Sequence, residues 1–472
     1  MSGEAVSTLA AASAAAVPGI AAERRTARLL HGPVLATLCS LALPNMLMIA
    51  SQALANALES WFVGLLGVAE LAGVALVFPL VMLMQMLSAG AIGGGISSTI
   101  ARALGAGRRE AAEAIALHAV VLALAAGALS SVALLAGGRL LYTAMDGRGA
   151  ALESALAYSD VIFAGVVFLW LLNALASVLR GAGNMALPAA VVSAGVPTLL
   201  IASPVLIFGL GPLPGLGIRG AALALVLYYL AGSTILLAAL LRGHGGVRLA
   251  WAPPLRRAIF REILGVGAPA AVNGTLTNVA VALATAFVGG LGVHVLAGFG
   301  LGIRLEYLLI PVVFGVGAAM IPMIGMSVGA GRLARAREIA WTGAALAAAV
   351  TGTIGVAAAL LARSWIGLFT DDAEAIAAGA RYLQLAGPAY ALIGLGLALS
   401  FAAQGARRMR WSMVASVGRA VTVAAVAALA GRLFGPGVEG VAVAVIAALV
   451  VYAVANAMPW LPRRAWLDAA TR

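Results

Sequence analysis

The sequence predicts an all-α membrane protein in which twelve transmembrane helices form two parallel six-helix lobes. Three observations lead to this fold class. The 472 residues are 63% hydrophobic and 10% charged, and the mean hydropathy is +1.07, a value far outside the range of soluble globular proteins. Twelve apolar stretches are long enough to cross a bilayer. The second six of these stretches repeat the first six in sequence.

Each stretch meets the length that a membrane-spanning helix needs, which is about 20 apolar residues. The predicted spans lie near residues 35–66, 69–103, 109–137, 150–181, 185–210, 218–242, 258–290, 293–328, 334–362, 374–404, 410–434 and 437–461. Several are longer than a bilayer requires. We expect these to tilt, or to kink at their internal prolines.

The arginines predict the topology. All 29 basic residues are arginine, and 21 of them lie in the two tails and in the breaks after even-numbered spans. By the positive-inside rule this side faces the cytoplasm, so we predict a multi-pass protein of the cell inner (plasma) membrane with both termini cytoplasmic. The same bias accounts for the net charge of +12, and we therefore expect no nucleic-acid partner.

The two halves match at an offset of 225 residues, which becomes 224 within the second span. Pro44 and Phe62-Val63-Gly64 correspond to Pro269 and Phe287-Val288-Gly289, and later Gly105-Ala106-Gly107-Arg108 corresponds to Gly329-Ala330-Gly331-Arg332. The second copy is therefore one residue shorter. Because each copy has an even number of spans, both enter the membrane from the same face. The pseudo-two-fold axis then lies along the membrane normal.

These features divide the chain into five parts. We predict a disordered cytoplasmic tail at 1–30, an N-terminal lobe at 31–242, a cytoplasmic linker at 243–257, a C-terminal lobe at 258–462 and a cytoplasmic tail at 463–472. Residues 1–30 lack the early basic region of a signal peptide. The arginines of the linker suit contact with anionic membrane lipid. We expect a monomer.

Glu59 is an acid in an otherwise apolar first span. An ionised carboxylate is expensive in hydrocarbon, so Glu59 should face a protein interior or a water-filled cavity, where it is a candidate proton site. Gln52 and Asn56 lie on the same helical face as Glu59. Asn45 and Ser203 are further neutral oxygen donors. A proton needs one carboxylate, whereas Na⁺ needs several oxygen ligands, so H⁺ coupling is favoured over Na⁺.

Other interpretations of these residues stay open. Gln52 and Asn56 also suit hydrogen bonding between packed helices, and Glu59 is also compatible with a hydrated helix end. Asp160 fits either a pocket or, preferably, the outer interface.

The candidate substrate cleft combines polar and methionine side chains. Its predicted members are Met86, Asn173, Asn278, Arg304, Glu306 and Met323. Methionine suits a surface that adapts to varied ligands. Arg304 and Glu306 are two residues apart, so they do not share a helix face and need partners elsewhere. Structural ion pairing with Arg419 or Asp160 is the alternative to a role in the cleft.

Several motifs recur along the chain in a fixed order. They are Glu59 followed by Phe62-Val63-Gly64 and Leu66-Gly67, the Gly-Ala-Gly-Arg turn of each half, Leu179-Arg180-Gly181-Ala182-Gly183-Asn184, Pro204–Gly209 followed by Gly217–Ala222, and Arg304–Pro311. Together they resemble the multidrug and toxic compound extrusion (MATE) family of transporters, over nearly the whole chain after residue 30. The resemblance implies secondary active efflux of amphipathic cations in exchange for H⁺ or Na⁺.

The chain departs from the family pattern at the ion sites. Members usually carry Asp where this chain has Glu59, and many carry Asn and Asp where it has Leu199 and Ser203. The region of the seventh span where the NorM-like branch has a Glu reads Asn273–Asn278, without an acid. The carboxylate of Glu59 is thus kept, whereas the other familiar acids are missing.

Other classes of function fit less well. One cysteine, four dispersed histidines and isolated acids form no catalytic or metal-ligating cluster, so we expect no enzyme, no metal and no cofactor beyond the coupling ion. A channel would need rings of charge or a carbonyl filter. A flippase or exporter of a lipid or metabolite with the same fold remains the alternative, together with Na⁺-coupled drug efflux.

The topology can be tested with introduced cysteines in a background that lacks the single native cysteine, Cys39. We expect a membrane-impermeant thiol reagent to label Asp146→Cys and Asp371→Cys in intact cells, but not Arg108→Cys or Arg332→Cys, because the arginine-rich side is cytoplasmic. The opposite labelling pattern would overturn the predicted orientation.

Overall fold

The computed structural model describes residues 18–243, 246–250, 254–433 and 437–461. These residues are almost entirely helical, apart from an antiparallel hairpin of β1 (Gly209–Leu210) and β2 (Leu213–Pro214). Eleven helical segments among them are long and apolar enough to cross a membrane. Helices α7 (Gly149–Ala164) and α8 (Val166–Gly181), which meet at a bend of 46°, make a twelfth when they are taken as one span. The predicted fold class is confirmed.

The helices divide into two lobes that follow the repeat. The N-lobe consists of α3 (Val34–Gly64), α4 (Val68–Gln85), the π-helix η1 (Met86–Ile92), α5 (Gly93–Gly105), α6 (Arg109–Ala144), α7 (Gly149–Ala164), α8 (Val166–Gly181), α9 (Ala186–Phe208) and α10 (Ile218–Leu241). The C-lobe consists of α11 (Arg257–Gly289), α12 (Val293–Gly329), α13 (Leu333–Leu360), α14 (Ala362–Gly367), α15 (Ala373–Ala386), the 3₁₀ turn η2 (Gly387–Ala389), α16 (Tyr390–Gly405), α17 (Met409–Leu433), α18 (Val438–Ala457) and the 3₁₀ turn η3 (Met458–Trp460).

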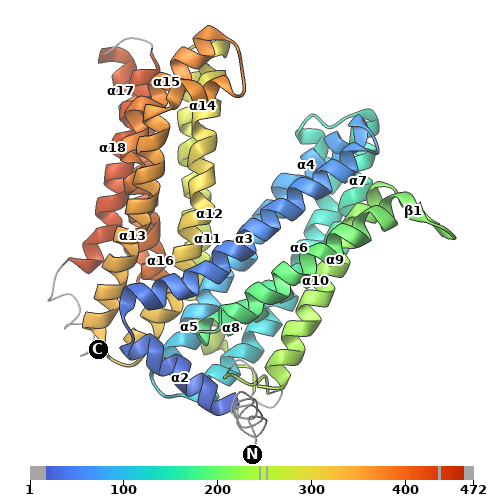
Figure 1. Ribbon diagram of the computed structural model, residues 1–472, viewed down its shortest axis with the longest axis vertical. Helices are drawn as coiled ribbons and strands as arrows, with labels where there is room; N and C mark the ends of the chain where they lie inside the picture. The colour runs from blue at the N-terminus through green and yellow to red at the C-terminus, as the bar shows by residue number, and fades with distance from the viewer. Residues whose placement is uncertain (1–17, 244–245, 251–253, 434–436, 462–472) are drawn as a thin grey trace, which may run out of the picture.

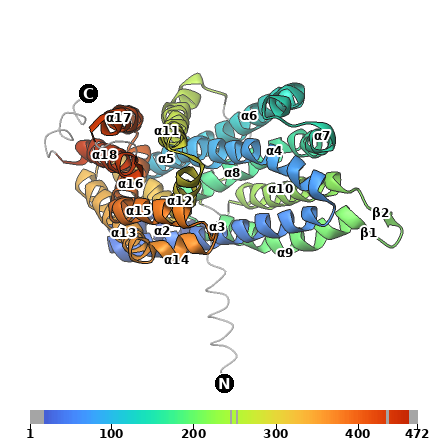
Figure 2. The same cartoon turned by 90° about the horizontal axis from the view of Figure 1, so that it is seen from above.

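The lobes form a V. They meet at the end of the molecule where both chain termini lie, and they splay apart at the end that carries α14 and the hairpin (Figure 1). Seen from above, α5 and α12 lie near the centre, between the outer helices of the two lobes (Figure 2). The end where the lobes meet, called the closed end below, also carries the two Gly-Ala-Gly-Arg turns, at Gly105 and Gly329.

Two predicted boundaries are wrong. Residues 18–30 were expected to be disordered, but Pro18–His31 forms the helix α2. Its buried Leu29 enters the core, and Arg335 of the C-lobe donates hydrogen bonds to the carbonyl oxygens of Leu29 and Gly32. This helix is stabilised by contacts with a distant segment, which its own composition does not reveal. The predicted stretch 1–17 lies outside the described residues, as do 244–245 and 251–253 of the linker and the predicted tail 463–472.

The third span is the other exception. Its predicted end was residue 137, before Gly138 and Arg139, but α6 continues to Ala144. Tyr142 in the added turns is fully buried in the N-lobe core. The burial of Tyr142 stabilises the helix beyond Gly137 and Gly138, although glycine is a weak helix former.

The closest approach between the lobes is a crossing of α5 and α12 that depends on glycine. A Cβ atom on Gly105 would collide with the carbonyl oxygen of Met326, and one on Gly329 would collide with the carbonyl oxygen of Arg102. The offset of 224 relates Gly105 to Gly329 and Arg102 to Met326. The two contacts are therefore repeat-related copies of each other, so the pseudo-two-fold axis passes through this crossing.

The π-helix accounts for the change of offset in the repeat. A π-helical turn arises when one residue is inserted into an α-helix. The second span of the N-lobe contains such a turn, Met86–Ile92, whereas its counterpart α12 is α-helical from Val293 to Gly329. The one-residue difference between the halves is thus an insertion in the first copy.

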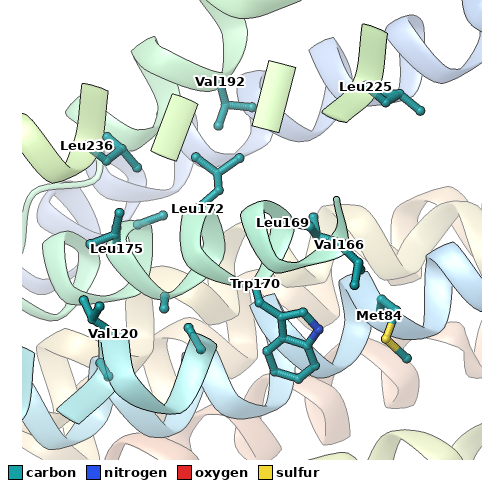
Figure 3. Close-up of a cluster of buried hydrophobic side chains, with 14 of the residues drawn as sticks. Met84, Val120, Val166, Leu169, Trp170, Leu172, Leu175, Val192, Leu225 and Leu236 are labelled. Carbon is teal, nitrogen blue, oxygen red and sulfur yellow. The ribbon is translucent and has the colours of Figure 1, made fainter. Parts of the chain in front are cut away.

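Helix α8 forms the centre of the N-lobe core. Its side chains Leu169, Trp170, Leu172 and Leu175 point toward apolar residues of several neighbouring helices (Figure 3). These neighbours include Met84, Val120, Val192, Leu225 and Leu236. All residues of α8 from Leu172 to Gly181 are buried, so this helix lies at the centre of the bundle rather than at its lipid face. This position holds the last turn of α8, which includes Arg180, inside the protein.

The glycine crossing can be tested with a single methyl group. We expect Gly329→Ala to lower the free energy of unfolding by about 1–3 kcal/mol, because the added Cβ overpacks the contact with α5. Gly289→Ala is the matched control, since its Cβ would have no neighbour within 4 Å and alanine favours the helix. Thermal and denaturant unfolding of the purified protein measure both. Equal stability of the two variants would contradict the close crossing.

Candidate functional site

Each lobe contains a pocket that reaches the other lobe. The N-lobe pocket has a cavity volume of about 290 Å³ and lies between α3, α4, α7, α9 and α10, with Pro311 of α12 at its border. Its polar lining residues include Gln52, Asn56, Glu59, Ser60, Gln85 and the three tyrosines Tyr158, Tyr228 and Tyr229. The pocket is thus a mostly apolar cavity with a few convergent polar groups, which is the usual composition of a ligand site.

Glu59 is the acid of the N-lobe pocket. It is 6% exposed, and its Oε1 atom has no hydrogen-bond partner among the described residues. Gln52 and Asn56 line the same pocket, as their helical spacing predicts. No arginine or histidine is among the residues that line it. A buried carboxylate without a countercharge strongly favours either a proton or a bound cation.

Asn45 and Ser203 do not join this group. Asn45 is buried, and its Nδ2 atom lies 3.6 Å from the sulfur of Met185. Ser203 is fully buried in α9 and lies outside the lining of the pocket, whereas Leu199, one helical turn earlier, lies within it. The face of α9 that meets the pocket is therefore apolar.

The C-lobe pocket has a cavity volume of about 170 Å³ and lies between α11, α12, α16, α17 and α18. Three residues of the predicted cleft line it, namely Met86, Asn278 and Glu306. Met86 belongs to the π-helix of the opposite lobe. The cavity therefore lies at the interface between the lobes.

Glu306 is paired rather than free. Arg419 of α17 donates a hydrogen bond of 2.7 Å to its Oε1 atom, and both side chains are 5% exposed. The guanidinium carbon of Arg419 also lies 5.6 Å from the ring centroid of Tyr452. The alternative prediction of an ion pair between Glu306 and Arg419 is confirmed. The pair leaves the C-lobe pocket with no net charge of its own.

The other three predicted cleft residues, Asn173, Met323 and Arg304, line neither pocket. Asn173 donates hydrogen bonds to Ser88 and Gln85 between helices. Met323 is fully buried in the core where the lobes meet, so it does not face a cavity. Their residue types alone did not indicate which way these side chains point.

Arg304 and Asp160 also lie outside both pockets. Arg304 is exposed, and its guanidinium lies 5.8 Å from the ring centroid of Phe369. Asp160 is exposed as well, which agrees with the preferred position outside a pocket. An arginine two residues from Glu306 on α12 could not reach the same cavity.

The two pockets are copies of one another with different polar groups. The repeat relates Gln52 to Thr277 and Tyr228 to Tyr452, and each of these residues lines the pocket of its own lobe. The counterpart of Glu59 is the buried Ala284. None of these tyrosines was among the predicted site residues, although the repeat offset pairs Tyr228 with Tyr452.

Comparisons with known proteins agree with this architecture. A family model described as MatE matches residues 44–205 and 269–429. A protein of Deinococcus radiodurans named probable multidrug resistance protein NorM is 31% identical, over 78% of this chain and 82% of that protein. A protein of Shewanella oneidensis named FAD transporter is 25% identical, over 83% of this chain and 87% of that protein.

Solved structures share the fold. The crystal structure of a MATE protein in the bent conformation has a TM-score of 0.85 at 24% identity, and the match covers 95% of this chain and 99% of that chain. A multidrug resistance MATE family transporter in an outward-facing conformation has a TM-score of 0.83, also at 24% identity, over 94% of this chain and 98% of that chain.

The buried ion pair predicts a specific pattern of stability. We expect Arg419→Met to lower the free energy of unfolding by about 3–5 kcal/mol, because it leaves the Glu306 carboxylate buried without a countercharge. Adding Glu306→Gln should recover most of that loss. Arg304→Met, which removes an exposed arginine, should change stability by less than about 1 kcal/mol. Unfolding of the purified variants measures each difference, and full stability of Arg419→Met alone would contradict the pairing.

Proposed function

Because this chain belongs to the MATE family, whose members are membrane transporters and not enzymes, we propose that it is an antiporter that exports amphipathic, cationic small molecules in exchange for H⁺. The observation that carries this proposal is Glu59. It is the one acid lining the N-lobe pocket, one of its oxygens has no partner among the described residues, and no basic residue lines the cavity. Either a proton or a cation can neutralise it, so the two compete for one site.

The N-lobe pocket favours H⁺ over Na⁺ as the coupling ion. A hard cation is held by several oxygen ligands at once. Asn45 and Ser203, two of the neutral oxygen donors considered for this role, lie outside the pocket lining. A proton needs only the carboxylate of Glu59. Na⁺ coupling through Gln52, Asn56 and the tyrosine hydroxyls is the alternative that the experiment below must exclude.

The shape of the molecule suggests how the exchange proceeds. The arginine bias assigns the closed end to the cytoplasm, so the V opens to the outside. In this state a proton reaches Glu59, removes its charge and releases the bound cation outward. The lobes then rock about the α5–α12 crossing to expose the site to the cytoplasm. We further propose a monomer in the cell inner (plasma) membrane.

Export of a metabolite is the second candidate function. The relative named FAD transporter covers most of this chain. The C-lobe pocket, which contains paired charges, amide side chains and the aromatic rings of Phe314, Phe401 and Tyr452, suits a planar polar compound better than it suits a simple cation.

The proposal is tested by flux in proteoliposomes. We expect Glu59→Gln, which mimics the protonated acid, to reduce export of cationic dyes driven by a pH gradient to the protein-free background. Glu59→Asp should keep part of the activity because it keeps the carboxylate. Asp160→Asn, which changes an exposed acid outside the pocket, is the matched control and should export normally.

Two outcomes would contradict the proposal. Normal export by a folded Glu59→Gln protein would remove Glu59 from the coupling mechanism. Export by the unaltered protein that responds to a Na⁺ gradient, but not to a pH gradient, would favour the Na⁺ alternative.

A further inference from the structure

A groove between α9 and α10 is larger than either pocket. This α9–α10 groove has a cavity volume of about 690 Å³, compared with about 290 Å³ for the N-lobe pocket. The two helices lie side by side (Figure 1), and every residue that lines the groove belongs to them or, in the case of Leu172, to α8 behind them. The groove therefore opens away from the interface between the lobes. Its exposed lining residues are Ala190, Ala194, Thr198, Leu227, Leu230, Ala231 and Ile235.

The groove lies at the depth of the bilayer centre. Its lining runs from Ala190 to Ala202 in α9 and from Ala224 to Ile235 in α10, which are the middle parts of two helices that are long and apolar enough to cross a membrane. At 1.5 Å per residue the α9 part is about 18 Å long, and the hydrocarbon core of a bilayer is about 30 Å thick. The exposed side of the groove thus faces lipid tails rather than headgroups or water.

The lining suits a single hydrocarbon chain. Thr198 and Tyr228 are its two residues with polar side-chain atoms, and the hydroxyl of Tyr228 already donates a hydrogen bond of 3.1 Å to the carbonyl oxygen of Val192. The floor is formed by the buried Leu172 and Gly232. A helix of a second protein, about 10 Å across, cannot reach that floor between helices whose axes lie about 8–10 Å apart. An unbranched acyl chain can.

The repeat does not by itself require this groove. In the C-lobe, side chains of α17 extend to α18: Ser412 donates a hydrogen bond of 2.8 Å to Oδ1 of Asn456, and Arg419 lies against an aromatic ring of α18. The offset of 224 places Pro188 and Gly195 at the positions of Ser412 and Arg419 in α9. Neither residue has a side chain that could reach α10 in this way, so the space between α9 and α10 is left less filled.

The groove shares a wall with the pocket of Glu59. Leu199 and Tyr228 line both the groove and the N-lobe pocket, so one layer of side chains separates the two. The ring of Tyr228 is held in this wall by its hydrogen bond to Val192 and by its contact with Gly195, where a Cβ atom would lie 2.7 Å from the ring. A chain bound in the groove contacts the outer side of the wall.

We propose that the α9–α10 groove binds one acyl chain of a membrane phospholipid, which packs against Tyr228 and Leu199 and completes the wall of the N-lobe pocket from the lipid side. Because lipid tails are as apolar as the groove, dispersion contacts rather than the hydrophobic effect favour binding. An empty groove would leave the atoms of its lining without neighbours. This lipid site is separate from the pocket that holds the exported compound and does not depend on the coupling ion.

The test is photo-crosslinking without any ion gradient. The probe is a phosphatidylethanolamine that carries a diazirine in one acyl chain, mixed into nanodiscs that contain the full-length protein. Mass spectrometry locates the adducts after illumination. We expect residues 190–202 and 224–235 to be labelled several-fold more often than the surface around Ala125, an exposed residue near the middle of α6. Both regions meet lipid at a similar depth, so a plain lipid contact predicts equal labelling.

Filling the groove should remove the excess labelling. Ala194→Phe combined with Ala231→Phe adds two rings at exposed positions of the lining, and we expect labelling of the groove to fall to the level around Ala125. Ala125→Phe is the matched control. It adds the same ring to an exposed alanine outside the groove and should leave labelling of the groove unchanged.

Variants of Tyr228 test the shared wall. Tyr228→Ala removes the ring, so the acyl chain should reach the N-lobe pocket, and labelling of Gln52 and Asn56, which line that pocket on α3, should rise. Tyr228→Phe keeps the ring and should not change the labelling of α3. If α3 is labelled equally in both variants, the wall does not separate the two cavities as proposed.

The lipid site is overturned if the groove and the surface around Ala125 are labelled equally, or if the double phenylalanine variant keeps the excess labelling. Should Tyr228→Ala fail to fold, the unaltered protein and the phenylalanine variants decide whether the site exists. Specific labelling of the groove, together with normal export by Glu59→Gln, would contradict the proposed function alone.

Discussion

The close crossing of α5 and α12 is the constraint on which the rest of the structure depends. Two backbones approach this closely only where glycine replaces a side chain, and Gly105 and Gly329 provide that space. Because the crossing lies at the closed end, the lobes are joined there and can separate at the other end (Figure 1). The N-lobe pocket and the C-lobe pocket each border the opposite lobe.

The two halves share their packing and differ in their polar chemistry. Glycines at helix crossings recur at repeat-related positions, as Gly181 against the backbone of Ser97 and Gly405 against the backbone of Ile321 illustrate. The buried charged groups do not recur. Glu59 corresponds to Ala284, and Arg180 corresponds to Gln404. Of these two repeat-related positions, the buried charge is therefore present in the N-lobe copy alone.

The π-helix of the second span adds to this difference. Its inserted residue changes the faces that the following side chains present. Met86, Gly90 and Ala91 from this segment line the C-lobe pocket. The N-lobe thereby contributes one methionine and two small residues to a cavity lined mostly by the C-lobe. In α12, which lacks the insertion, Pro311 borders the N-lobe pocket in a corresponding manner.

The sequence by itself determined the fold class, the twelve spans and the repeat, because hydropathy and helix length are set locally by residue type. It also identified Glu59 and the shared face of Gln52 and Asn56, since helical spacing fixes which residues lie together.

Only the tertiary structure decided which polar residues meet a cavity. Arg419 reaches Glu306 across more than one hundred positions of the chain, whereas Arg180 has no such acidic partner among the described residues. Asn45, Asn173 and Met323 are turned into packed interfaces. The packing of helices from distant parts of the chain determines which way each of these side chains points. No local pattern of residues encodes that packing.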